Sequence, residues 1–553
     1  MNLTRAIIVL SLGIVLGVPL LFRPDSAIVP PGAATLVIVT PHNEQIRYEF
    51  GRAFNAWHQR EHGQPVVIDW RRPGGTSEIR KLLIHEYAVA IERGKLLPDG
   101  RLLGADDKSF PLGTMSHDLF FGGGSYEHNQ MIFDPARNRG GAKGTPPGGS
   151  ADVGLSISVP AGLSQELLDD AFGPHVAGEP PRVGREPLYQ PAQHWIGTAL
   201  SGFGIVFNRD ALQGTRDPVT GQRAGGLGVP DPKNWDDMTD PRLTGWVALA
   251  DPRQSGSVTT TYNSILDNLG WDEGWRVLRD MCANARYFTN NATKVPIDVS
   301  HGEAAVGVAI DFYGRYESQA VRQPGELPSE SRVGYINPPG MTYIDPDPIS
   351  LLRGGPALAD EQTPDDIGQR FIIFCLSDEA QALWQFPSRG EEPGLGPHEY
   401  ELRRMPVTRS MYTSHADRFI DELNPWGDAS SKPYAGWRSL ISELMPAFSI
   451  AIHAEHVDAW RALNRARAGS VDAETLEEME RLYYAMPTIE VDVEGERVPM
   501  ELSAANYRAI RSEWMSDEAR SSGRYDRVRI EITEFFRQQY RRVVALERDA
   551  GAT

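Results

Sequence analysis

The sequence is poor in cysteine and lacks an excess of basic residues. Its 553 residues include two cysteines, Cys282 and Cys375, which match no metal-binding spacing such as C-x-x-C. The formal net charge is −19, from 55 Lys and Arg against 74 Asp and Glu. Proteins that dock on nucleic acid or anionic lipid need a basic surface to neutralise phosphates. We therefore predict no nucleic-acid partner and two buried thiols, with a disulfide as the alternative in an oxidising compartment.

Long apolar runs are absent beyond the N-terminus. Arg5 precedes an apolar run of 17 residues, Ala6 to Phe22, which Arg23 and Asp25 end. This length is just at the lower limit for a spanning helix, so residues 1–34 are expected to be either a cleaved signal peptide with a linker or a retained membrane anchor. Both alternatives place the rest of the chain in the periplasm or on the outer face of the cytoplasmic membrane.

Motifs of common enzyme sites are also missing. The sequence contains neither G-x-x-x-x-G-K-[ST] nor G-x-S-x-G. Residues 85–86 (HE) and 453–456 (HAEH) lack the zincin spacing, and residues 345–347 (DPD) lack the remaining ligands of a calcium loop. We therefore expect no enzyme and no catalytic residue; a glycan or phosphate hydrolase is the alternative.

Strands and helices alternate in two blocks, which predicts an α/β fold of two lobes with a cleft between them. The hydrophobic fraction of 41% is ample for packed cores. The expected organisation is a first lobe at 35–205, a second lobe at 206–335, a return segment completing the first lobe at 336–429, and a helical C-terminal extension at 430–553.

The first globular segment is a strand (36–39), a loop (40–43) and an amphipathic helix with apolar residues at helical spacing. Such a connection places free backbone N–H groups at the carboxyl end of a sheet, where α/β proteins bind ligands. His42 and Asn43 in this loop are therefore candidate ligand-binding residues.

Small hydroxyl residues in glycine-containing loops precede two further predicted helices. Thr76 and Ser77 precede one helix, with Ser77 as its expected N-cap, and Ser255 and Ser257 precede another. Helix N–H groups with hydroxyls bind anions without lysine, although ordinary helix capping explains the same residues.

Three other loops or strand ends carry candidate residues. Gly123, Gly124 and Ser125 follow a short apolar strand, where glycine permits close backbone approach to a ligand. Ser201 lies in residues 197–204 (GTALSGFG), which we interpret as a hinge or ligand loop before a strand. Asp311 and Tyr313 end a buried strand, where they could bind a cation or hydroxyl groups, or simply cap the strand.

Several of these pieces, taken in order, resemble the periplasmic substrate-binding proteins of ABC importers, in particular the ferric-ion-binding branch of the type 2, transferrin-like class. The matching stretches lie between about residues 36 and 407: TPHNEQIRYEF, GGTSEIRKLL, HDLFFGGG, WIGTALSGFGIVFNRD, PKNWDDMTDPRLTGWVALADPRQSGS, HGEAAVGVAIDFYGRYES, FIIFCLSDEAQALWQF and LRRMPV.

This resemblance implies two α/β lobes that close on a solute, an ABC permease as membrane partner, and no resident cofactor. It also implies a metal set for Fe(III) as cargo, with or without a synergistic anion, of which His42 and Tyr313 match the histidine and the second tyrosine. The first tyrosine position is Phe312, which cannot ligate, and the acid position falls at Gly124-Ser125 with Glu127 only nearby.

The cargo is therefore expected to be either ferric iron or an oxyanion-bearing solute such as a phosphorylated sugar, a phosphonate or an organic acid. A membrane-tethered solute sensor or scaffold on the same fold is the alternative to a transport component, motivated by the N-terminal segment and the added helical region.

Overall fold

The computed structural model describes residues 32–96, 115–217, 220–323, 326–327, 330–355 and 367–550. The segment predicted as signal peptide or anchor therefore lies almost wholly outside the described residues. Within the described ranges, no helix has both the length and the apolar character needed to cross a bilayer.

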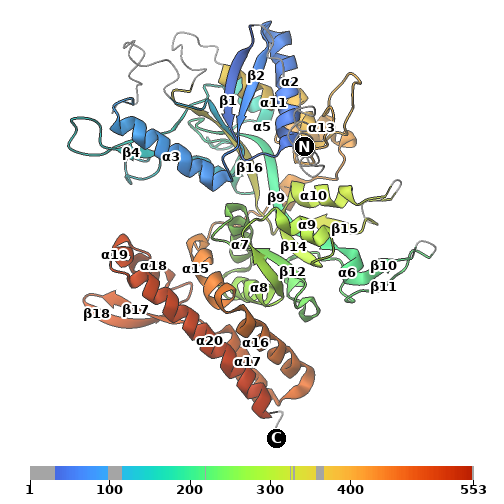
Figure 1. Cartoon of the computed structure of the whole chain (residues 1–553), viewed down its shortest axis with the longest axis vertical. Helices are drawn as coiled ribbons and strands as arrows, with labels where there is room; N and C mark the ends of the chain where they lie inside the picture. Colours follow the sequence, from blue (N-terminus) through green and yellow to red (C-terminus); the bar gives the residue numbers. More distant parts are fainter. Residues whose placement is uncertain are drawn as a thin grey trace, which may run out of the picture.

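One sheet of ten strands runs through two lobes stacked above one another (Figure 1). Its order is β13-β12-β14-β9-β16-β3-β1-β2, with β15 paired to β9 and β6 to β16. The strand bounds are β1 (Ala34–Val39), β2 (Val66–Arg71), β3 (Leu119–Phe121), β6 (Ser158–Val159), β9 (Ile196–Asn208), β12 (Val247–Ala250), β13 (Ala285–Thr289), β14 (Val306–Ile310), β15 (Val333–Ile336) and β16 (Ile344–Leu352).

The first lobe is built on β2, β1 and β3, which are parallel, and on the antiparallel β16. Its helices are α2 (Glu44–His62), α3 (Thr76–Glu92), α4 (Ser125–Asn129), α5 (Gln165–Phe172), α11 (Ile367–Leu376), α12 (Asp378–Gln385), α13 (Arg409–Ser414) and α14 (Pro425–Asp428). Aromatic packing joins early and late segments of the chain, because the rings of Phe50 and Trp384 lie 4.5 Å apart. Hairpins β4 (Ala142–Gly144)–β5 (Val153–Leu155) and β7 (Arg182–Val183)–β8 (Glu186–Pro187) complete this lobe.

The second lobe contains the parallel strands β13, β12 and β14. Its helices are α6 (Arg209–Gln213), α7 (Gly256–Leu269), α8 (Trp271–Ala283), α9 (Lys294–Ser300) and α10 (Asp311–Ala320), with a hairpin of β10 (Gly214–Arg216) and β11 (Arg223–Gly225). The observed architecture confirms the predicted two-lobed α/β fold.

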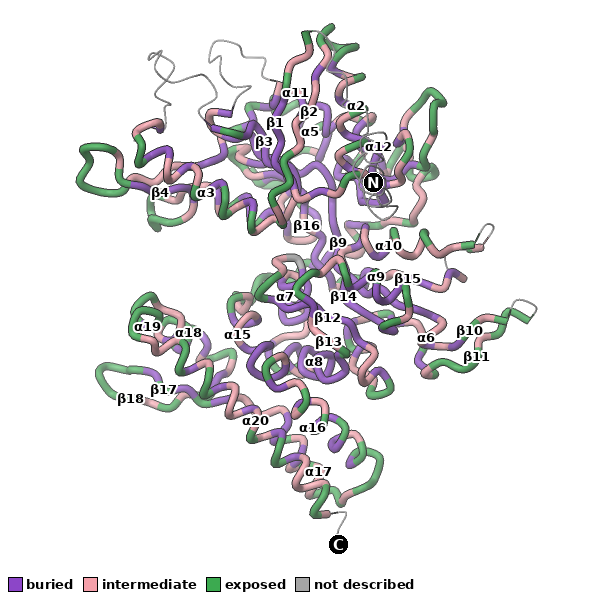
Figure 2. The backbone as a smooth tube through the Cα atoms, viewed as in Figure 1, coloured by how far each residue is buried: buried purple, intermediate pink, exposed green. Residues whose placement is uncertain are grey.

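The long strand β9 joins the lobes. Its first half pairs with β16 in the first lobe, and its second half pairs with β14 and β15 in the second. All thirteen residues are buried, which Figure 2 shows as a continuous purple stretch. The prediction of a loop at 197–204 was wrong, because these small residues let neighbouring backbone pack closely: a Cβ on Gly204 would lie 2.0 Å from the Ile336 carbonyl oxygen.

Residues 367–385 form two helices, α11 and α12, which meet at Ser377. The Ser377 hydroxyl accepts a hydrogen bond from the Ala380 N–H and so caps α12 as a new helix. The two cysteines are free and buried, Cys375 in the core of the first lobe and Cys282 in that of the second, which confirms the prediction of two buried thiols.

The C-terminal extension packs against the second lobe and shares its hydrophobic core (Figure 1). It comprises α15 (Arg438–Phe448), α16 (His453–Arg465), α17 (Ala473–Tyr484), the hairpin β17 (Thr488–Val493)–β18 (Glu496–Glu501), α18 (Tyr507–Trp514), α19 (Asp517–Ser521) and the long α20 (Arg524–Ala550). The Trp460 indole N–H donates to Asn284 Oδ1 over 2.8 Å. Buried Arg279 of α8 lies beside the rings of Phe448 and Phe536 of the extension.

Removal of the extension should therefore destabilise the second lobe itself. A chain ending at residue 429 would expose many apolar side chains of α8, each worth roughly 1.5–3 kcal/mol when buried. We expect this truncation to be insoluble or to melt at least roughly 10 °C lower in circular dichroism. The control Ile530→Ala, at a side chain that is 68% exposed, should leave the melting temperature unchanged. A soluble truncation with the melting temperature of the full chain would contradict the shared core.

Candidate functional site

The N-terminal ends of four helices converge where the lobes meet. In the first lobe α2 follows β1 and α3 follows β2, and in the second lobe α7 follows β12 and α10 follows β14. Helices α3 and α7 meet across the boundary, because a Cβ on Gly256 would lie 3.7 Å from Ser77 Oγ and 3.4 Å from Glu127 Oε1. Helix N-termini carry partial positive charge and unpaired N–H groups, so the junction is favourable for an anion.

A buried polar cluster lies at the start of α2. His42 Nε2 is 3.0 Å from Asp347 Oδ2 of β16 and 3.0 Å from an Arg404 guanidinium nitrogen. Arg404 also pairs with Asp347 and donates to Ser201 Oγ of β9 over 2.5 Å. All four side chains are almost fully buried. His42 Nδ1, Asp347 Oδ1 and Arg404 Nε have no hydrogen-bond partner within the described structure.

The charge in this cluster resides on Arg404 and Asp347. Burial, together with the charges of Arg404 and Arg47, outweighs the effect of Asp347 and lowers the pKa of His42, so His42 is neutral near pH 7. Burial raises the pKa of the Asp347 carboxyl, but Arg404 and His42 outweigh burial and hold this pKa below its ordinary value. The cluster is thus an arginine–carboxylate pair with a neutral imidazole beside it.

The glycine loop after β3 packs directly on this cluster and on α3. Gly122 and Gly123 adopt φ values of +100° and +102°, which glycine reaches without strain. A Cβ on Gly122 would lie 2.5 Å from His42 Nε2, and one on Gly123 would lie 2.2 Å from Thr76 Cγ2. The loop therefore brings three predicted site elements together: His42, Thr76 and the Gly123-Gly124 backbone.

Ser125 makes two hydrogen bonds to Asp345 of β16. Its N–H and hydroxyl donate to the Asp345 carboxylate over 3.1 and 2.7 Å. Burial, followed by the nearby Glu186 charge, raises the pKa of Asp345 to about 7. Ser125 thus fixes the glycine loop to β16, the strand beside β9 in the first lobe.

The predicted N-cap at Ser77 was wrong, because α3 begins at Thr76 and its N-cap is Gly75. The Glu78 carboxylate accepts from the Gly75 N–H and closes this helix end, so Ser77 is left within the first turn. Its hydroxyl donates to Glu127 Oε1 over 2.8 Å, and Arg80 pairs with the same carboxylate.

Asn43 and Ser255 are helix N-caps. Asn43 Oδ1 accepts from the Ile46 N–H over 3.0 Å, and Ser255 Oγ accepts from the Val258 N–H over 3.4 Å. Both residues lie at the junction, as their helices do. Ser257 lies in the first turn of α7, and its side chain is outside the described structure.

Residues 311–313 open α10 in the second lobe and face the first-lobe cluster. The Phe312 ring lies under the Arg404 guanidinium, 4.3 Å from ring centroid to carbon, and 4.2 Å from the Tyr313 ring. Asp311 is buried and accepts from the Phe312 N–H, and burial raises its pKa to about 6. Burial also raises the pKa of Tyr313, while the charges of Arg404 and Arg72 lower it.

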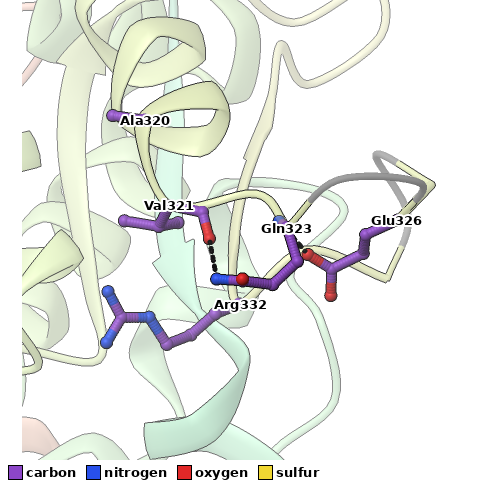
Figure 3. A pocket seen from close by; sticks show the side chains of 5 residues that line it. All are labelled: Ala320, Val321, Gln323, Glu326 and Arg332. Atoms are coloured by element: carbon purple, nitrogen blue, oxygen red, sulfur yellow. Dashed lines mark hydrogen bonds between the residues drawn. The ribbon is translucent and has the colours of Figure 1, made fainter.

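The described residues contain no group of three or more His, Cys, Asp and Glu side chains able to hold a metal ion. The two residues predicted as iron ligands, His42 and Tyr313, both lie near Arg404, whose fixed positive charge opposes a nearby cation. A separate pocket lies at the C-terminal end of α10 (Figure 3) and is lined by Ala320, Val321, Gln323, Glu326 and Arg332.

Sequence reasoning missed Arg404, Asp347 and Asp345. Arg404 stands in the stretch LRRMPV, which was noted only as part of the resemblance, and the two aspartates stand in residues 345–347, which were considered only as a calcium loop. The available signal was the acid-Pro-acid pattern at residues 345–347 within an apolar strand. Carboxylates buried in such a strand need hydrogen-bond or charge partners, so the pattern indicates a buried polar cluster.

Comparison with known proteins supports the resemblance found in the sequence. Residues 163–407 match the family model described as bacterial extracellular solute-binding protein. The chain is also similar to the phosphoglycerate transport regulatory protein PgtC of Salmonella typhimurium, with 27% identity over 198 residues, which cover 36% of this chain and 42% of PgtC. An uncharacterized protein of Haemophilus influenzae is 28% identical over 166 residues, or 30% of this chain and 43% of that protein. The chain thus spans less than half the length of these relatives.

Solved structures of similar shape include a ferric binding protein from Campylobacter jejuni, with a TM-score of 0.42, 15% identity, and coverage of 77% of this chain and 99% of that one. Another is AfuA from Actinobacillus pleuropneumoniae with fructose-6-phosphate bound, with a TM-score of 0.43, 15% identity, and coverage of 75% and 98%. Residues 163–407 thus resemble the bacterial extracellular solute-binding proteins, in agreement with the resemblance found in the sequence.

The glycine loop provides a test of close packing at the junction. Gly123→Ala places a methyl group against Thr76 Cγ2, so we expect a loss of about 2–3 kcal/mol in the free energy of unfolding. Gly148→Ala, which has a φ of +74° but nothing within 4 Å of the added Cβ, should cost less. Thr76→Ser removes the clashing methyl and should partly restore Gly123→Ala. Equal losses for the two glycine variants in urea unfolding would contradict this packing.

His128 should make stability depend on pH. Its ring stacks on Phe120, and its nitrogens bond Ser350 Oγ and the Gly122 carbonyl over 2.7 and 3.1 Å. Burial lowers the pKa of His128 to about 4, so the unfolded chain binds the proton first as pH falls. The stabilisation that neutral His128 provides above about pH 6.5 should be lost progressively as pH falls to about 4. The free energy of unfolding should decrease by roughly 3 kcal/mol over this range.

His128→Gln should flatten this dependence, measured as the free energy of unfolding in urea between pH 7 and 4. His85→Gln, at an exposed histidine of α3, is the control and should retain it. The same slope in His128→Gln and in the unaltered protein would exclude His128 as its source.

Proposed function

We propose that this protein is the solute-binding component of an import system and that it captures an organic solute carrying an oxyanion, a phosphoryl or carboxylate group, between its lobes. The observation that carries the proposal is Arg404, held at the lobe junction by Asp347, Ser201 and the Phe312 ring, with its Nε unpartnered. The match of residues 163–407 to extracellular solute-binding proteins supports the binding role.

An anion suits this junction better than a cation. Four helix N-termini and the hydroxyls of Thr76 and Ser201 surround it, and such groups stabilise negative charge in a water-poor setting. Phe312 and Tyr313 stand beside Arg404 and offer aromatic faces for the carbon skeleton of a solute. The similarity to PgtC, whose name refers to phosphoglycerate transport, motivates a phosphorylated carboxylate as the first solute to test.

Ferric iron is disfavoured by the same geometry. Fe(III) requires anionic oxygen donors, yet Phe312 has none and the raised pKa of Tyr313 favours a neutral phenol. Glu127 is the acid nearest the position expected for an acidic iron ligand. Its carboxylate already accepts a hydrogen bond from Ser77 and pairs with Arg80. A ferric ion beside His42 would also stand next to the Arg404 guanidinium.

We infer an ABC permease in the cytoplasmic membrane as partner, a location in the periplasm or on the outer membrane face, and solute capture without chemical turnover. These inferences rest on the solute-binding family match and on the apolar N-terminal run. A solute sensor is the second candidate, favoured by the extension that shares the second-lobe core and by the name of PgtC, a transport regulatory protein.

A thermal-shift panel tests the solute class. The purified chain should be stabilised by 3-phosphoglycerate or a related phosphorylated carboxylate, by about 2.7 kcal/mol at a concentration of one hundred times Kd. Arg404→Lys keeps the positive charge but loses the planar guanidinium, which can donate two parallel hydrogen bonds to an oxyanion. The Kd for the protecting solute, measured by calorimetry, should therefore rise roughly 10- to 100-fold. Arg409→Lys, a nearby arginine that bonds the Phe172 carbonyl, is the control. Protection by no anion, or equal Kd in the two variants, would contradict the proposal.

A further inference from the structure

A short segment leading into the extension lies against both lobes. Residues 430–438, which we call the latch, follow α14 and end at the first residue of α15. Most of the latch is exposed, so its contacts are those of a surface strap and not of a core. The segment lies beyond residues 163–407, the stretch that matches the solute-binding family.

The latch holds the first lobe through the β7–β8 hairpin. The Tyr434 hydroxyl donates to the Glu186 carboxylate, and the Tyr434 ring stacks on the Arg185 guanidinium at 3.3 Å. Arg185 donates in turn to the Lys432 carbonyl over 2.6 Å, and its guanidinium carbon also lies 3.5 Å from the centroid of the Tyr343 ring. The arginine is thus clamped between a latch residue and Tyr343, the residue just before β16.

The latch holds the second lobe through α7. The Ala435 N–H donates to Asp267 Oδ1 over 2.9 Å, and Ser430 Oγ donates to Asn268 Oδ1 over 2.7 Å. Asp267 has a fully buried side chain that also accepts from Arg185 of the first lobe over 3.3 Å. One carboxylate therefore receives hydrogen bonds from the first lobe and from the latch.

Arg438 occupies the point where all three parts meet. Its guanidinium donates to the Gly256 carbonyl over 3.0 Å and to Thr260 Oγ1 over 2.9 Å, both on α7. The same guanidinium lies over the Tyr126 ring of α4 in the first lobe, at 5.2 Å. Gly256 is the residue that faces Ser77 and Glu127 across the junction.

We propose that residues 430–438 form an interlobe latch through which the C-terminal extension stabilises the closed arrangement of the lobes and thereby raises solute affinity. Ala435 and Arg438 bond α7 of the second lobe, while Tyr434 and Arg438 contact the first lobe, so movement of the lobes apart must break one of these sets of contacts. Interactions made only in the closed arrangement shift the open–closed equilibrium toward it. The effect on affinity rests on the proposed solute-binding function, whereas the effect on closure does not.

The experiment measures lobe separation directly in the purified full chain without added solute. Spin labels at Lys81→Cys on α3 and Asp272→Cys on α8, both exposed positions on different lobes, report the interlobe distance by double electron–electron resonance. The native cysteines are buried, which protects them from labelling. We expect a mainly short distance in the unaltered background and a several-fold larger long-distance population in Arg438→Ala and in Tyr434→Phe.

A double-mutant cycle distinguishes a specific effect of the latch on lobe opening from a general loss of stability. If Arg438 acts through Tyr126, Arg438→Ala should open the lobes far less in a Tyr126→Leu background than alone. Arg511→Ala, which removes a hydrogen bond to Ser439 within the extension, is the matched control and should leave the distances unchanged. Melting curves verify that each variant is folded.

Unchanged distances in both latch variants, or additive effects in the cycle, would overturn the proposal. Titration with 3-phosphoglycerate then tests affinity, where we expect Kd to rise about as much as the closed population falls. Opening of the lobes without any phosphoglycerate binding would refute the proposed solute and leave the latch intact.

Discussion

The pair between Arg404 and Asp347 is the interaction on which the junction depends. Asp347 belongs to β16 and Arg404 to the returning segment, and together they hold Ser201 of β9 and His42 at the start of α2. Because these groups are buried, loss of either partner leaves an uncompensated charge in a poorly solvated place. The pair therefore joins β16, β9 and the start of α2 at one point and leaves an arginine beside the aromatic start of α10.

Two long-range connections link this local cluster to both lobes. Strand β9 passes through both lobes without interruption, so the lobes share one sheet. The extension shares the core of the second lobe and reaches the first through residues 430–438. Movement of the lobes at the junction is thus coupled to β9 and to the C-terminal extension, which lie far from the cluster in sequence.

Local patterns predicted much of this architecture, and tertiary packing decided the rest. The strand, loop and helix around His42 follow from periodicity, and the N-cap at Ser255 follows from residue type. The glycine-rich residues 197–204 were mistaken for a loop, because their small size serves close strand packing that only the partner strand reveals. Arg404 and Asp347 escaped notice because their partners lie 57 positions apart and the pairing has no local signature.

A visible absorption titration with ferric citrate determines whether the arginine at the junction selects anionic organic solutes over ferric iron. A tyrosinate ligand bound to Fe(III) would give a broad visible band that saturates near one equivalent. We expect no such band, and we expect 3-phosphoglycerate to protect the same preparation against thermal unfolding. A saturating band that Tyr313→Phe abolishes would contradict this expectation and make iron the cargo.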